Sequence, residues 1–283
     1  MTTIGTGVEP VGVTDSVGLA RLRWRVTDIL TICHRNLLQL KHAPGQIVGT
    51  VAFPLTAVVL FGYVFGSAIP IAEGANYRAY LMPGLFVMST VTTLVTAMIT
   101  LVGDSDLGVM DRFRSMPAER SSILFGQTLS DLLTNAVSLL VMAGAGLVVG
   151  WRVQTGPGSA LAGFGLLMLL QFAISWVGLF LGTVIRNVQT AAKLGPLIMP
   201  VTMISNVFVP TEGMPTVLRT VAEWNPVSAS VAACRQLFGN PASTAVDPAW
   251  PIAHPIIATV GWSVLLIVIF MPLAIRRFDT GPN

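Results

Sequence analysis

Six apolar stretches restrict what this chain can fold into. They fall at about residues 48–68, 80–102, 123–150, 160–185, 194–209 and 252–275. The hydrocarbon core of a bilayer is about 30 Å thick, and roughly 20 residues of helix cross it. Backbone groups inside lipid must be hydrogen-bonded within the protein, so such stretches fold as helices. We therefore expect an all-α membrane protein with six transmembrane helices.

The composition supports the same fold class. Hydrophobic residues make up 53% of the chain and charged residues 10%, whereas about a quarter of an average soluble domain is charged. The net charge of +3 does not indicate a nucleic-acid partner, because the basic residues lie beside apolar stretches, where they set membrane topology.

The distribution of basic residues predicts the orientation. With the N-terminus inside, the outer segments hold only Arg78, Arg152, Arg219 and Arg235, and the remaining Lys and Arg are cytoplasmic. The positive-inside rule then places both termini in the cytoplasm. Cys33 and Cys234 fall on opposite sides of the membrane, which excludes a disulfide between them.

The N-terminal part divides into two segments. Residues 1–16 are polar and expected to be poorly ordered. In residues 17–44, apolar side chains recur on one helical stripe, and basic side chains such as Arg21 and Arg25 lie on other faces. This amphipathic helix either lies on the membrane interface or packs on the protein's own cytoplasmic surface. Residues 45–283 then form the transmembrane domain.

The segment 210–251 is too charged for a seventh span and too apolar for a free loop. It reads as two short outer helices, at about 214–223 and 225–238. Asn225 and Pro226 are typical of an N-cap followed by the first helical position, and Gly239 is typical of a helix end. We expect these helices to dip into the outer leaflet.

Enzyme and cofactor motifs are missing. Neither Lys41 nor Lys193 has the Gly-Lys-Ser/Thr context of a P-loop. His34, His42 and His254 lack metal-ligand spacing. We therefore expect no catalytic residue, no metal site and no cofactor on this chain. No sequence motif supports its interpretation as a membrane hydrolase.

Polar residues line one face of the third span. Gln127, Asp131 and Asn135 are four residues apart, with Ser130, Thr134 and Ser138 beside them. Such a face should point toward protein or water, as part of a transport path or as interhelical hydrogen bonds. Weaker polar stripes occur on the second and fifth spans. The candidate substrate-path residues are Gln127, Asp131, Asn135, Thr93, Thr96, Thr202 and Asn206.

The loop at 103–122 carries the clearest local signal. Leu107, Met110, Phe113 and Met116 recur every third residue among charges, and Pro117 ends the pattern. Apolar side chains on a short charged helix suit a groove on another protein. The alternative is a helix that lies on the membrane surface.

At this loop the sequence resembles the permease subunits of ABC-2 type exporters, above all the daunorubicin/doxorubicin resistance permeases of actinobacteria. Met110-Asp-Arg-Phe-Arg-Ser-Met-Pro is similar to their cytoplasmic motif. Asn225-Pro-Val-Ser and the downstream Arg235 are similar to the segment before their last span. The likeness extends over about residues 21–277.

The resemblance implies the partners and the cargo. It implies a bacterial plasma-membrane exporter in which a separate ABC ATPase, present in two copies, binds ATP and magnesium. A second permease chain, identical or a paralogue, would complete the assembly, and the cargo would be a hydrophobic or amphipathic drug or lipid. A polysaccharide or teichoic-acid permease and an ion-coupled secondary transporter remain as alternatives. The residues implied to couple to the ATPase are Leu107, Met110, Asp111, Arg112, Phe113, Arg114, Met116 and Pro117.

Overall fold

The computed structural model describes residues 52, 56, 58–60, 77–106, 120–185, 187–240 and 248–280, and these ranges contain helices and no strand. Four helices are long and apolar enough to cross a membrane: α3 (Tyr77–Asp106), α5 (Arg120–Val149), α6 (Pro157–Val184) and α11 (Pro255–Thr280). The shorter elements are α7 (Val188–Met203), the 3-10 turn η2 (Thr211–Gly213), α8 (Thr216–Trp224), α9 (Pro226–Phe238) and α10 (Trp250–Ala253).

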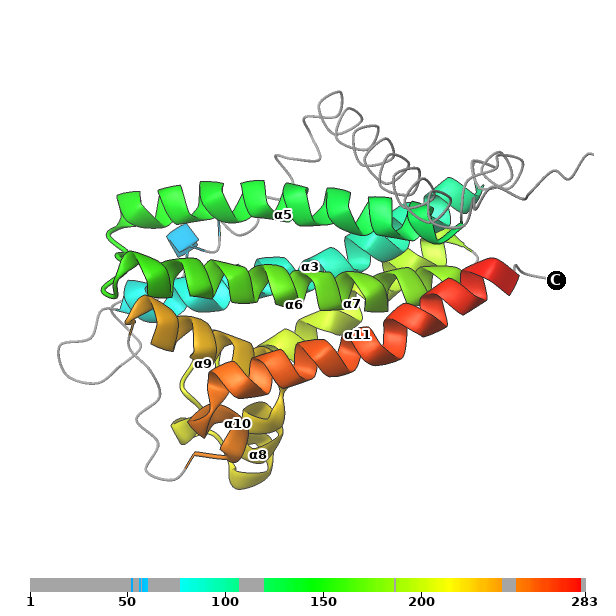
Figure 1. The fold of residues 1–283 in the computed structure, drawn as a ribbon. Helices are drawn as coiled ribbons and strands as arrows, with labels where there is room; N and C mark the ends of the chain where they lie inside the picture. The colour runs from blue at the N-terminus through cyan, green and yellow to red at the C-terminus, as the bar shows by residue number, and fades with distance from the viewer. Residues whose placement is uncertain are drawn as a thin grey trace, which may run out of the picture.

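The four long helices run side by side in one bundle, and α8, α9 and α10 gather toward the end opposite the C-terminus (Figure 1). We call this end the α9 end. The most extensive packing joins α3 to α6 and α6 to α11. α5 lies against α3 and α6, and α7 packs chiefly against α3. The all-α membrane class expected from the sequence is confirmed in these ranges.

The close packing of α3 and α6 depends on two glycines one turn apart. A Cβ atom at Gly178 would lie 2.5 Å from the carbonyl oxygen of Leu94, and one at Gly182 would lie 3.1 Å from that of Met98. Small residues let membrane helices approach until their backbones touch. At this pair of glycines the backbones of α3 and α6 are therefore in direct contact.

An aromatic cluster holds the α9 end together. The ring of Phe86 on α3 lies edge-on to Trp151 and Phe238, with centroid distances of 5.3 and 6.0 Å. The Trp151 indole donates a 2.8 Å hydrogen bond to Asn240 Oδ1, because a buried Trp N–H needs an acceptor. The turn between α5 and α6 is thereby fixed to the end of α9.

Most helix boundaries lie within a few residues of those expected from the sequence, and the clearest differences at helix starts lie near prolines. The predicted fifth span at 194–209 is wrong in its bounds, because the helix there, α7, covers Val188–Met203. α7 is also shorter than the four helices that are long enough to cross a membrane. Pro196 and Pro200 lie within it and remove two backbone donors. The last long helix begins at Pro255 rather than at 252, since the residue before a proline disfavours helical angles and His254 has φ −124° and ψ 61°.

Three predicted features lie largely or wholly outside the described residues. These are the amphipathic helix at 17–44, the first span at 48–68 and the loop residues 107–117. The six-span count and the N-terminal helix are therefore expectations from the sequence.

We expect Gly178→Ala to destabilise the bundle and Gly165→Ala to leave it intact. Both glycines lie on α6, but a Cβ at Gly165 meets nothing within 4 Å. Overpacking of a tight interface costs about 1–3 kcal/mol, so Gly178→Ala should lower the melting temperature in detergent. Thermal unfolding followed by size-exclusion fluorescence measures this, and equal melting curves for both variants would contradict the packing described.

Candidate functional site

The polar face of α5 points into the protein, as the sequence predicts. Gln127 and Asn135 are buried on this face, and Leu133, Val137 and Leu140 on the opposite face are exposed. Ser130 and Ser138 are buried beside them. The face therefore lies against α3 and α6 rather than toward lipid.

Hydrogen bonds connect this face to its neighbours. Asn135 Nδ2 lies 3.4 Å from Thr90 Oγ1 on α3. The Thr93 hydroxyl donates to Gln171 Oε1 on α6 at 2.7 Å, and Gln171 Nε2 donates to Ser175 Oγ at 3.2 Å. Gln171 was missed in the sequence, although it is the only amide side chain in its span. These residues form a polar layer between three helices.

Two oxygens in this layer have no hydrogen-bond partner among the described residues. They are Asp131 Oδ2 and Asn135 Oδ1, and both atoms are buried. Asp131 Oδ1 accepts a 3.0 Å hydrogen bond from Gln127 Nε2. Asp131 lies 11 residues after the start of α5 at Arg120, about 16 Å along the axis. α5 thus offers spare acceptors on two successive turns, well inside the bundle.

The other predicted path residues lie elsewhere. Thr96 on α3 is exposed on the surface of the described chain, whereas Thr202 is buried near the end of α7. Asn206 is buried just beyond that helix, and its Oδ1 also has no hydrogen-bond partner among the described residues. The predicted set therefore divides between the α3–α5–α6 layer, the surface of α3 and the end of α7.

Beyond α7 the backbone is irregular, and one stripe of α3 holds it. The hydroxyl of Tyr77 donates to the carbonyl oxygen of Phe208, and that of Tyr80 donates to the carbonyl oxygen of Asn206, both at 3.1 Å. A Cβ at Gly84 would lie 2.8 Å from the carbonyl oxygen of Val207. Residues 77, 80 and 84 share one helical face, so α3 contacts three consecutive carbonyls of the segment 206–208.

Arg235 of α9 completes this arrangement. Its side chain is buried, and Nε donates to the carbonyl oxygen of Tyr80 at 3.0 Å. Nη2 donates to the carbonyl oxygens of Asn206 and Val207 at 2.8 and 3.3 Å. The guanidinium carbon lies 3.5 Å from the Tyr80 ring centroid, a cation–π contact. Burial lowers the pKa of Arg235, but guanidinium groups stay protonated in proteins. We call Tyr77, Tyr80, Gly84 and Arg235 with the segment 206–208 the carbonyl clasp.

Asn225 closes the end of α7 from the other side. Its Nδ2 donates 2.8 Å hydrogen bonds to the carbonyl oxygens of Val201 and Ile204. Its Oδ1 accepts from the backbone N–H of Val227 at 2.9 Å and caps α9. The predicted N-cap is confirmed, and so is the predicted helix end at Gly239, whose φ is 68°. One side chain thus satisfies the end of one helix and the start of the next.

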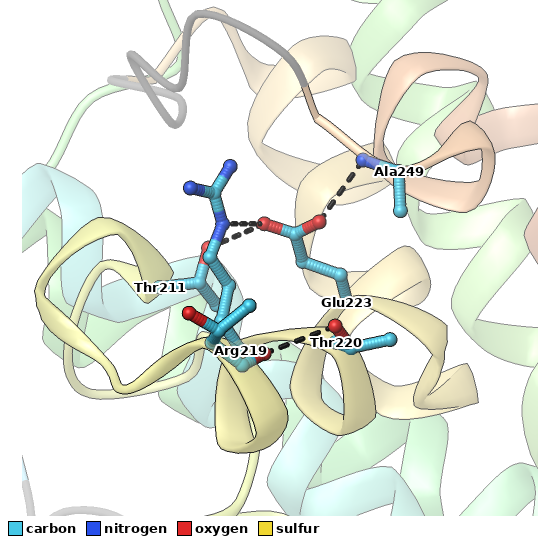
Figure 2. A network of polar contacts seen from close by, with 6 residues as sticks. Thr211, Arg219, Thr220, Glu223 and Ala249 are labelled. Carbon is cyan, nitrogen blue, oxygen red and sulfur yellow. Dashed lines mark hydrogen bonds and ion pairs between the residues drawn. The ribbon is translucent and has the colours of Figure 1, made fainter.

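A second polar cluster ties the short helices to one another (Figure 2). The Glu223 carboxylate on α8 is buried and accepts from Arg219 Nε at 2.6 Å and from the backbone N–H of Ala249 at 3.0 Å. The Thr211 hydroxyl of η2 lies 3.5 Å from the same carboxylate. Because a buried carboxylate needs such partners, Glu223 fixes η2 and the start of α10 to α8.

The fold and these motifs agree with the comparisons. The model of the ABC-2 type transporter family matches residues 27–238. This chain belongs to the ABC-2 type transporter family. The match includes α3, the loop that follows it, and all of α9 with Arg235.

Relatives of this ABC-2 permease include drug-resistance permeases. It is 28% identical over 254 residues to a daunorubicin resistance ABC transporter permease protein of Streptomyces coeruleorubidus, covering 89% of this chain and 86% of the relative. It is 26% identical over 242 residues to a doxorubicin resistance ABC transporter permease protein of Mycobacterium tuberculosis, with 80% of each chain covered. Both relatives are named as permease proteins of ABC transporters. Within the described ranges, no group of His, Cys, Asp and Glu could hold a metal ion.

We expect Asn225→Asp to separate the two roles of this side chain. Aspartate keeps the capping oxygen but cannot donate to the carbonyls of Val201 and Ile204. Asn225→Ala loses both roles, at about 1 kcal/mol for the cap and about 1–3 kcal/mol for unsatisfied carbonyls. Thermal melting of the purified chain should rank wild type above both variants. If Asn225→Asp were as stable as wild type, only the cap would matter.

Proposed function

We propose that this chain is the membrane-spanning permease subunit of an ATP-driven exporter that moves a hydrophobic or amphipathic drug or lipid out of the cell. The observation that carries the proposal is the near full-length similarity to daunorubicin and doxorubicin resistance permeases. The absence of a P-loop in the sequence fits this division of labour, because ATP and magnesium then bind to a separate ATPase chain.

The proposed assembly pairs two permease chains with two ATPase subunits in a bacterial plasma membrane. Each permease chain has six spans, with residues 48–68 as the first, and both termini are cytoplasmic. The amphipathic helix at 17–44 lies at the cytoplasmic interface. In this orientation the α9 end is the outer end of the bundle.

The loop between α3 and α5 is the proposed contact with the ATPase. α3 ends at Asp106 and α5 begins at Arg120. A displacement of the loop between them would therefore be passed to both long helices. Phe113 and Met116 insert into a cleft of the ATPase, and Arg112 and Arg114 pair with an acidic rim. Buried aromatic anchors carry much of the affinity of such contacts.

We expect Phe113→Ala to abolish transport and weaken copurification of the ATPase, while the permease still inserts. Truncation of an anchor costs about 2 kcal/mol or more, or roughly thirtyfold in affinity. Arg114→Ala should be milder and salt-dependent, since rim charges contribute less at equilibrium. Pull-down of the ATPase over a salt series measures both.

Two outcomes would count against this coupling. ATP hydrolysis by the purified permease alone would end the exporter proposal itself. A photocrosslinker at position 113 that forms adducts only with lipid, together with full ATPase retention in Phe113→Ala, would place the loop on the membrane surface instead.

The proposed cargo route runs along the polar faces of α3 and α5 and past the end of α7. Support comes from the buried oxygens of Asp131, Asn135 and Asn206, which lack partners among the described residues. A cargo hydroxyl or amine could donate to them, and buried acceptors gain most from such a partner. Gln127, Thr93, Thr96 and Thr202 complete the proposed lining.

We expect Asn135→Leu and Thr202→Leu to change cargo preference while the complex still assembles. The matched control is Val137→Leu, an exposed position on the apolar face of α5. Export of doxorubicin and of a fluorescent phosphatidylcholine, each measured in proteoliposomes, should shift in ratio for the first two variants only. Unchanged export of both probes by both variants would make the polar face purely structural.

A further inference from the structure

The two ends of α3 contact different parts of the proposed transporter. At one end, its Tyr77, Tyr80 and Gly84 stripe contacts the segment 206–208 through three consecutive carbonyls. At the other end, α3 stops at Asp106, directly before the loop proposed to meet the ATPase. The helix has 30 residues, which is about 45 Å, so a single element joins both places.

The segment beyond α7 is held by α3 and α9 together, because Arg235 and Ser228 of α9 bond to the backbone of Asn206 alongside the tyrosines of α3. Among the described helices, α7 packs extensively only against α3. The irregular backbone that follows then bonds to Tyr77, Tyr80 and Arg235. A displacement of α3 along or across the membrane would therefore move this segment with it, as long as the clasp holds.

Arg235 fastens the two backbones directly to each other. One guanidinium donates to the Tyr80 carbonyl on α3 and to the Asn206 and Val207 carbonyls beyond α7. The planar fork and the stacking on Tyr80 are properties that lysine lacks. Lysine at this position would keep the positive charge but could not reproduce the same set of bonds.

We propose that Arg235 and Tyr80 are positioning residues that couple the segment 204–210 to α3, so that movement of α3 driven by the ATPase opens or closes the outer end of the cargo route. This inference rests on the proposed function. It assigns the transmitting contact to a specific pair of side chains, remote from both the ATPase and the polar layer of α5.

The test compares Arg235→Lys with Arg219→Lys in the complete complex with its ATPase in proteoliposomes. Arg219 also bonds through its guanidinium, but to Glu223 on α8, and so provides the same substitution away from α3. Doxorubicin transport and ATP hydrolysis are measured together. Arg235→Lys should keep hydrolysis within twofold of wild type and lose tenfold or more in doxorubicin moved per ATP, whereas Arg219→Lys should keep the wild-type ratio.

A second readout needs no cargo. Val209 is exposed, and Val209→Cys in a Cys33→Ser background, with the buried Cys234 left in place, reports on the segment. In the otherwise wild-type complex, the rate of modification by a membrane-impermeant maleimide should change at least threefold between nucleotide-free and vanadate-trapped states. Adding Arg235→Lys should remove this difference, and adding Arg219→Lys should not.

The outcomes separate the inference from the proposed function. A wild-type chain that captures no ATPase overturns the exporter proposal and this inference with it. A nucleotide-dependent wild-type complex in which Arg235→Lys keeps both the labelling difference and the transport ratio overturns the inference alone. Tyr80→Phe, which keeps the ring under Arg235 but loses the hydroxyl bond to Asn206, is the second variant if Arg235→Lys does not assemble. Because Arg235 keeps its bonds in this variant, we expect a partial loss of doxorubicin moved per ATP, and full coupling in it would contradict the inference.

Discussion

The backbone beyond α7 imposes the constraint on which the rest of the structure depends. An irregular segment inside a protein is stable only where its backbone polar groups have partners, because an unpaired buried carbonyl is costly. Here the donors come from both sides: Tyr77 and Tyr80 of α3, and Asn225 and Arg235 of α9. The position of α9 over the end of the bundle follows from that requirement.

The hydrogen bonding differs between the two polar regions of the molecule. In the carbonyl clasp every named donor has a partner. Elsewhere on α3, the backbone contacts α6 at Gly178. In the layer beneath α5, Asp131 and Asn135 each keep an oxygen without a partner among the described residues. The clasp has its donors paired but keeps one spare acceptor, Asn206 Oδ1, where it meets the proposed cargo route. Paired donors favour a rigid connection, whereas spare buried acceptors favour ligand binding. This difference supports assigning transmission to the paired donors of the clasp and cargo recognition to the buried oxygens that lack partners.

Sequence reasoning succeeded where a local rule decides the structure. The Asn225-Pro226 start and the Gly239 end of α9 follow from capping chemistry, and the inward polar face of α5 follows from its helical spacing. It failed where partners are far apart in the chain. The bonds of Tyr80 to Asn206 and of Thr93 to Gln171 join residues 126 and 78 positions apart, and no periodicity identifies such pairs. The early end of α7 was missed for the same reason, because the donors that replace its helical bonds belong to other elements.

The most direct measurement of the central claim is a pair of cryo-EM structures of the assembled transporter, one nucleotide-free and one trapped with ATP. The account predicts that α3, the segment 204–210 and α9 superpose as one body in both states, with the Arg235 guanidinium within hydrogen-bond distance of the Asn206 carbonyl each time. Separation of Arg235 from that carbonyl in either state, with α3 and the segment moving independently, would contradict it.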